Sequence, residues 1–170
     1  MKGSQYEREL RGILEGDMKT LSRSVKSCTT MEKEQYLQII EKPFAVVRAA
    51  GSLGVDLVAV RGDVSFLIEI KSSSLPTLHF STMAGKLQQQ ADAMIELCQK
   101  TKTLPIYAFR LKNIRGDSWR LFTLDISNLI GRLNIVHRRL PKLETSKNNN
   151  YIMRWKNGMQ LSDFINYITQ

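Results

Sequence analysis

Two carboxylates and a lysine lie at a spacing that suits metal-dependent hydrolysis of a phosphodiester. Asp56 lies in one apolar run, VDLVAV, and Glu69 and Lys71 lie in the next, VSFLIEIK. Side chains alternate between the two faces of a strand, so Glu69 and Lys71 should share one face while Ile68 and Ile70 face apolar packing. If the two runs form a β-hairpin, Asp56 can converge with Glu69 on one cation.

A divalent cation between Asp56 and Glu69 would remove the repulsion between two neighbouring carboxylates. Mg²⁺ is the expected ion, with Mn²⁺ as a substitute, because Mg²⁺ prefers oxygen ligands and retains water. Such an ion acidifies a bound water and stabilises charge developing on a phosphate. Lys71 could orient that water or stabilise the transition state. The alternative is a strand with surface charges and an aspartate in a turn, because short charged patterns are common.

Glu7 favours the catalytic interpretation. On a helix over residues 5–25, Glu7 falls within ~20° of Leu14, Met18 and Val25, in the middle of the apolar stripe. Glutamate is seldom buried unless it is paired or ligated, so we expect Glu7 to join Asp56 and Glu69 around a metal or its water. The alternative is a capping-box glutamate in the first helical turn, with Ser4 as the N-cap.

The elements that must position these groups follow from the periodicity of apolar residues. Helices are expected at 5–25, 31–41 and 81–101, and strands at 43–51, 55–60, 64–71, 104–111 and 118–124. The later part predicts a short helix at 125–133, strands at 134–138 and 151–156, and a last helix at 160–168. This order predicts one α/β domain over residues 1–170, a mixed sheet flanked by helices.

Composition narrows the classes of function. The chain has 25 Lys and Arg against 16 Asp and Glu, a net charge of +9, which favours a polyanionic partner although it could also serve solubility alone. No apolar run approaches the ~18 residues that span a bilayer, and the charged N-terminus lacks the apolar stretch of a secretory signal. We therefore expect a cytoplasmic protein without membrane contact. Neither cysteine has a ligand at zinc spacing, so a zinc site is not expected.

Four segments in this order, GSQYEREL, VVRAAGS, VDLVAV and LIEIKSS, closely resemble the archaeal Holliday-junction resolvases of the PD-(D/E)XK nuclease superfamily. LPIYAFRL and SWRLF are similar to later strands of that family. The resemblance implies the restriction-endonuclease-like fold, a Mg²⁺-dependent endonuclease activity and branched double-stranded DNA, the four-way junction, as substrate. Because resolution needs two symmetric cuts, it also implies a homodimer.

The resemblance assigns roles position by position. Asp56 and Glu69 are implied as the principal metal ligands, joined by the backbone carbonyl of Ile70, with Glu7 assisting and Lys71 acting on the nucleophile or phosphate. Catalysis also includes Ser52, placed near the scissile phosphate. The implied DNA contacts are Arg8, Arg48 and Lys2. One of Gln88, Gln89 and Gln90 matches a helical glutamine of related nucleases.

The chain departs from the family pattern in two segments. An insertion at about 16–41 carries extra basic residues, which either extend the DNA surface or lengthen the helical layer. An extended basic C-terminal segment covers about 125–170, where Tyr151, Met153 and Trp155 suit either one packed face of a strand or stacking on bases. Two other functions remain open: another PD-(D/E)XK DNA repair nuclease, and a non-catalytic module that binds branched DNA.

Overall fold

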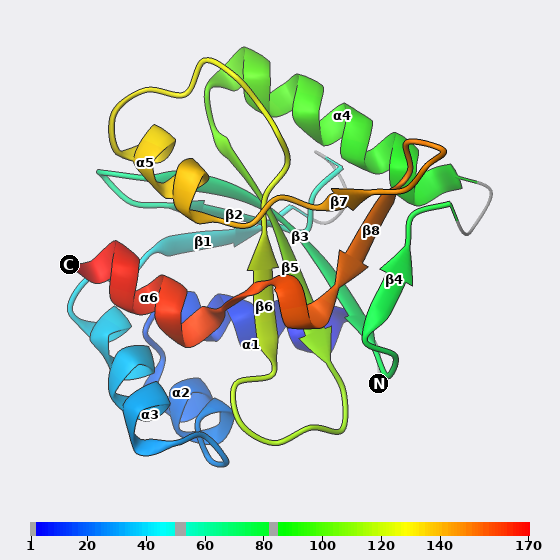
Figure 1. The fold of residues 1–170 in the computed structure, drawn as a ribbon. Helices are drawn as coiled ribbons and strands as arrows, with labels where there is room; N and C mark the ends of the chain where they lie inside the picture. Colours follow the sequence, from blue (N-terminus) through cyan, green and yellow to red (C-terminus); the bar gives the residue numbers. More distant parts are fainter. Residues whose placement is uncertain (1–2, 50–53, 82–84) are drawn as a thin grey trace.

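A six-stranded mixed sheet forms the centre of the computed structural model, which describes residues 3–49, 54–81 and 85–170 (Figure 1). The strand order is β1-β2-β3-β5-β6-β9. In chain order these strands are β1 (Ala45–Arg48), β2 (Leu57–Val60), β3 (Ser65–Ser73), β5 (Leu104–Leu111), β6 (Trp119–Phe122) and β9 (Met159–Gln160). Only β3 and β5 pair in parallel, and the other neighbours are antiparallel. The predicted hairpin between the Asp56 and Glu69 runs is therefore present.

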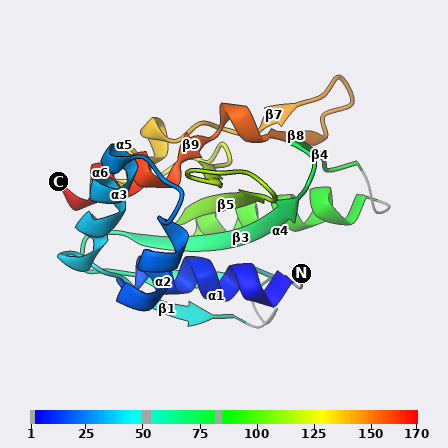
Figure 2. The same cartoon turned by 90° about the horizontal axis from the view of Figure 1, so that it is seen from below.

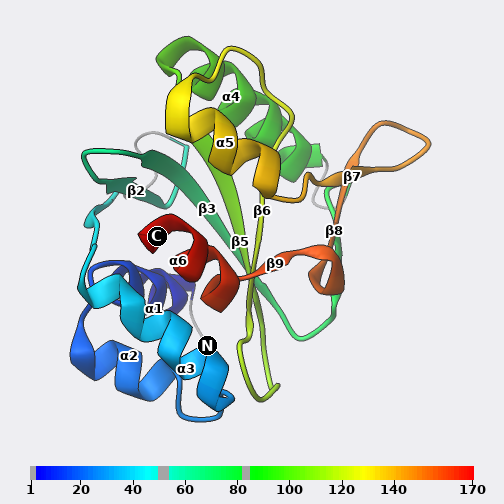
Figure 3. The same ribbon diagram turned by 60° about the vertical axis from the view of Figure 1, so that its left-hand side comes forward.

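Helices cover both faces of this sheet (Figure 3). One face carries α1 (Gly3–Leu14) and α6 (Leu161–Thr169), and the other carries α4 (Lys86–Thr101) and α5 (Gly131–Arg139). A parallel pair such as β3 and β5 needs a crossover, and α4 supplies it. The predicted class, a mixed sheet flanked by helices, is confirmed. None of the helices in the described ranges combines the length and apolarity needed to cross a bilayer.

The helix predicted over residues 5–25 is wrong, because α1 ends at Leu14 and α2 (Met18–Ser24) follows as a separate helix. Gly16 between them has φ +74°, a left-handed conformation that suits glycine. Asp17 then caps α2 by accepting the backbone N–H of Thr20. The two helices pack closely, since a Cβ on Gly12 would lie 2.5 Å from Thr20 Oγ1.

Because α1 ends at Leu14, the apolar stripe predicted for residues 5–25 does not continue beyond it. Met18 is 55% exposed, so it does not continue the stripe of α1. Ser4 lies inside α1, and the alternative of a capping box between Ser4 and Glu7 is therefore wrong. The capping box that does form, between Thr29 and Glu32, starts α3 (Thr30–Leu37).

The insertion packs against the C-terminal segment. Helix α3 lies along α6 (Figures 1 and 3), and Asp117, two residues before β6, bonds to both helices. The buried Asp117 carboxylate accepts hydrogen bonds from Tyr36 Oη at 2.7 Å, Ser162 N at 2.8 Å and Trp119 N at 3.1 Å. One side chain thus connects the insertion, the central sheet and the last helix.

The C-terminal segment differs from its prediction in its first half. Residues 134–138 are helical, within α5, and not a strand, and α5 begins at Gly131, whose φ is +59°. The segment then forms a small second sheet, in which β8 (Tyr151–Arg154) lies between β4 (Thr77–His79) and β7 (Glu144–Thr145). Figure 2 shows this sheet on the side of the central sheet opposite α1. The predicted last helix matches α6.

Trp155 packs within this segment. It begins a short 3₁₀ helix at Trp155–Asn157, its Nε1 donates to the Ser118 carbonyl at 3.0 Å, and the Arg120 guanidinium lies 3.8 Å from its ring centre. Met153 is fully buried. These contacts favour the packing role over stacking on bases.

Candidate active site

Asp56 lies immediately before β2, beside β3, and hydrogen bonds with the β3 main chain fix it there. Its N–H donates to the Ile68 carbonyl at 3.0 Å, and its Oδ2 accepts the Ile70 N–H at 2.7 Å. The N–H and C=O of one strand residue point to the same edge, so the Ile70 carbonyl lies on this edge too. Asp56 and the Ile70 carbonyl therefore belong to one corner of the sheet.

Glu69 and Lys71 point from β3 to the α4 face, as strand alternation predicts. Lys71 Nζ donates to Glu69 Oε1 at 2.7 Å and to Gln90 Oε1 of α4 at 3.0 Å. The Glu69 side chain is only 4% exposed and the Lys71 side chain 15%. An ammonium held in this way by two acceptors has little freedom to leave the site.

Burial raises the pKa of both Asp56 and Glu69 above the ordinary carboxyl values. The Lys71 charge opposes the shift at Glu69, and the Ile70 N–H opposes it at Asp56. The charge of Asp56 also raises the pKa of Glu69, and the charge of Glu7 raises the pKa of Asp56. The site therefore carries more negative charge than its surroundings accommodate, a condition that a bound cation relieves.

Glu7 lies on the other face of the sheet, with Arg48 as its partner. Leu10 and Leu14 of α1 pack on Phe66 and Ile68, whose side chains point away from the Glu69 face. Glu7 Oε2 accepts from Arg48 Nε at 3.0 Å and from a second guanidinium nitrogen at 2.6 Å. Asp56 thus lies between Glu7 and Glu69, and the three carboxylates do not surround one point.

The predicted ligand set of three carboxylates is accordingly not assembled. Over residues 3–49, 54–81 and 85–170, no group of three or more His, Cys, Asp or Glu side chains is arranged to hold a metal ion. Glu69 Oε2 is nevertheless buried and has no hydrogen-bond partner among these residues. A buried oxygen atom without a partner is costly, and an oxygen-preferring cation beside Asp56 would satisfy it. The residues present therefore fit a Mg²⁺ held by Asp56, Glu69 and the Ile70 carbonyl.

Three predicted residues remain, and the structure describes only one of them, Arg8. Arg8 is exposed on α1, and within the described part of the chain its side chain makes no hydrogen bond or ion pair. Lys2 and Ser52 lie outside the described residues.

Gln90 belongs to the site and was not singled out from its neighbours by sequence. Gln89 is exposed, and Gln88 Oε1 accepts the Tyr151 N–H at 2.8 Å, in the small second sheet. All three glutamines precede the buried Ala91 of α4, so polarity and period could not distinguish them. To single out Gln90, one would have needed to know where Lys71 lies relative to α4.

Comparison with known proteins adds a family to this geometry. The model of the family described as archaeal Holliday junction resolvase (hjc) matches residues 26–170, a range that includes Asp56, Glu69 and Lys71 but not Glu7 or Arg8. Among solved structures, the chain is similar to Archaeoglobus fulgidus Hjc, described as a Holliday junction resolvase from an archaeal hyperthermophile. That likeness has 18% identity and a TM-score of 0.49, and it covers 80% of this chain and 96% of that chain. No curated protein matches the chain.

Proposed function

The chain belongs to the archaeal Holliday junction resolvase family, and from this we propose that it cuts four-way DNA junctions by metal-dependent hydrolysis at Asp56, Glu69 and Lys71. As a member of that family it is a structure-selective nuclease. The metal, the roles of the residues and the assembly are our proposals. The observation that carries them is the buried Glu69 carboxylate, which has one oxygen on Lys71 and the other without a partner in the part of the chain that the structure describes.

Asp56, Glu69 and the Ile70 carbonyl would hold the metal ion. When bound, Mg²⁺, or Mn²⁺ in its place, supplies an acidified water and a positive charge for the phosphate. The raised pKa values of Asp56 and Glu69 mean that the ion and protons compete for these carboxylates. Metal binding should therefore weaken as the pH falls toward those pKa values.

Lys71 holds the attacking water or a phosphate oxygen. A lysine ammonium has three N–H donors, and two of them are used by Glu69 and Gln90. The third is available to the substrate at a fixed position. Because the ammonium is ordered before the substrate arrives, stabilising the charge of the transition state needs little reorganisation.

Arg48 contacts the DNA backbone, and Glu7 orients it. Glu7 occupies two nitrogens of the guanidinium, and the Arg48 side chain is 40% exposed. The unused N–H donors suit a phosphate oxygen. Glu7 thus acts on the substrate through Arg48. Arg8, next to Glu7 on α1, adds a second exposed guanidinium.

The assembly is a homodimer on branched double-stranded DNA. Two symmetric cuts need two active sites related by a two-fold axis. The net charge of +9 favours recognition of the junction through its shape and phosphates, without base reading.

Asp56→Asn tests this proposal. The amide keeps an oxygen acceptor for the Ile70 N–H but removes the ligand charge, so we expect junction binding to remain and Mg²⁺-dependent cutting to fall by at least a hundredfold. Asp125→Asn, at an exposed loop position, is the matched control and should cut normally.

The measurement is cleavage of a synthetic four-way junction with nicks mapped on all four strands, with and without Mg²⁺. Paired nicks placed symmetrically across the junction support resolution. Persistent cutting by Asp56→Asn would remove Asp56 from the mechanism. Preferential cutting of a flap or a damaged duplex would instead point to another repair nuclease of the superfamily.

A further inference from the structure

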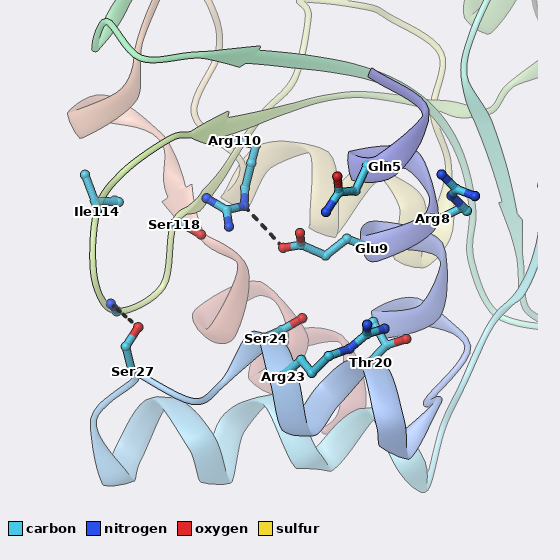
Figure 4. A pocket seen from close by; sticks show the side chains of 11 residues that line it. Gln5, Arg8, Glu9, Thr20, Arg23, Ser24, Ser27, Arg110, Ile114 and Ser118 are labelled. Atoms are coloured by element: carbon cyan, nitrogen blue, oxygen red, sulfur yellow. Dashed lines mark hydrogen bonds and ion pairs between the residues drawn. The ribbon is translucent and has the colours of Figure 1, made fainter. Parts of the chain in front are cut away.

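A polar cleft lies on the side of α1 that faces away from the sheet corner with Asp56. It has a volume of about 530 Å³ and lies between α1, α2 and the turn that joins β5 to β6 (Figure 4). We call it the α1–α2 cleft, and the residues that matter here are Gln5, Arg8, Glu9, Arg23, Ser24 and Arg110. Its volume falls in the range of ligand sites, ~300–1,000 Å³.

The charge in the cleft is predominantly positive. Three arginines line it against one glutamate, Glu9. Glu9 Oε1 is already neutralised, since it accepts from Arg110 Nε at 3.2 Å and from Trp119 Nε1 at 2.9 Å. The side chains of Arg8 and Arg23 make no hydrogen bond or ion pair with any residue that the structure describes. The Arg23 guanidinium is therefore available to an anion in the cleft, and Arg8 lies at its rim, with its side chain on the far side of α1 from Glu9 (Figure 4).

The walls of the cleft are fixed before any ligand binds. The α1–α2 contact leaves no space for a Cβ at Gly12, which would lie 2.5 Å from Thr20 Oγ1. At the far end, the Gly116 N–H donates to Ser27 Oγ at 3.0 Å, joining the insertion to the β5–β6 turn. A site with walls held in this way loses little entropy on binding.

The cleft and the active site lie on either side of α1. Glu7 and Glu9 are two residues apart, about 200° around the helix, and Glu7 points to Arg48 while Glu9 points into the cleft (Figure 4). Arg8 lies between them on the edge of the helix. A DNA strand that crosses this edge could contact Arg48, Arg8 and Arg23 in turn.

We propose that the α1–α2 cleft binds a backbone phosphate in an arm of the junction away from the bond that is cut. Planar guanidiniums match phosphate oxygens in a bidentate geometry, and Arg23 comes from the insertion. The insertion thereby extends the DNA surface in addition to lengthening the helical layer. This inference rests on the proposed function in one respect, that the ligand is the DNA substrate.

The test measures the binding of a synthetic four-way junction in Ca²⁺, without cutting, over a series of salt concentrations. Arg23→Ala should weaken binding about three- to tenfold and lower the slope of log K against log salt by about 0.9, the effect of one lost phosphate contact. Lys19→Ala is the matched control, because Lys19 is an exposed cation on the same helix but does not line the cleft. It should leave the slope unchanged.

A second variant places negative charge inside the cleft. Ser24→Asp should weaken binding at least as much as Arg23→Ala, and in Mg²⁺ both variants should keep the cutting rate of the bound junction.

Equal slopes for Arg23→Ala and the wild type would overturn the inference, as would equal losses for Arg23→Ala and Lys19→Ala. Failure of the wild-type chain to bind a junction would also overturn it. A wild-type chain that binds but does not cut would contradict the proposed function alone, because the slopes could still be compared.

Discussion

Replacing Asp117 with alanine should destabilise the chain by ~3 kcal/mol, because three donors would lose their acceptor at once. Tyr36 and Trp119 are 1% exposed and Ser162 is fully buried, so water cannot replace the carboxylate easily. Leaving a buried donor without a partner costs ~1–3 kcal/mol, which for three donors sums to ~3–9 kcal/mol, and we take the low end. Burial also raises the pKa of Asp117, so removing its costly charge offsets part of the loss.

Urea unfolding followed by far-ultraviolet circular dichroism measures this loss. With a urea dependence of ~2 kcal/mol per molar, the midpoint should fall by ~1.5 M. Tyr36→Phe removes only one of the three donors and should cost ~1 kcal/mol. The two variants together test whether the hydrogen bonds, and not the volume of the side chain, hold the insertion on the last helix.

Asp163 provides the matched control. It accepts from Gln35 Nε2 at 3.2 Å and so joins the same two helices as Asp117, but at an exposed position. Asp163→Ala should cost less than ~0.5 kcal/mol, as exposed polar substitutions usually do. A loss for Asp117→Ala no larger than that of Asp163→Ala would refute the reasoning.

Three further changes test the site and its support. Gln90→Ala removes one acceptor of Lys71, so kcat should fall about three- to tenfold in single-turnover cleavage while junction binding stays constant. Gly12→Ala forces a methyl group against Thr20, so unfolding in urea should show a loss of ~1–3 kcal/mol despite the better helix propensity of alanine. Asp56→Asn should raise the melting temperature in EDTA at pH 7 by roughly 2 °C. The pKa of Asp56 is raised in the folded state from its ordinary value of 3.8. The stability that Asp56 contributes is therefore fully present below pH 3.8 and is lost as the pH rises through the folded-state pKa.

Each change has its own check. Gln89→Ala, at the exposed neighbour of Gln90, should leave cleavage unchanged, and an equal loss would exclude a specific role for Gln90. Gly3→Ala, on the same helix as Gly12 but with open space around its Cβ, should not destabilise. The gain of Asp56→Asn should vanish in melts near pH 3.5, and a gain independent of pH would contradict the assigned cause.

The sequence predicted β1, β2, β3, β5 and β6 closely, because each is a short and strongly apolar run bounded by turn residues, whereas the two-residue strand β9 was not predicted. The run 104–111 is β5 without any shift in its bounds. Prediction failed where one residue decided the conformation. Gly16 breaks a helix that periodicity alone would continue, and 134–138 is too short for its β-branched residues to distinguish strand from helix.

The candidate site was predictable to the extent that it follows strand geometry. Alternation along β3 places Glu69 and Lys71 on one face, and the hairpin brings Asp56 beside them. The place of Glu7 could not be predicted in the same way. A helical wheel gives a direction around one axis, whereas the convergence of carboxylates depends on which face of the sheet that helix covers.

The contact between α3 and α6 has a consequence for synthesis of the chain. Gln35 and Asp163, which meet across it, are 128 residues apart. At ~5–20 residues per second on the ribosome, the surface of α3 around Tyr36 would wait ~6–25 s for its cover. Nascent chains would expose this apolar patch to chaperones until α6 has been made, and a chain that lacks α6 would keep it exposed and become a substrate for proteolysis.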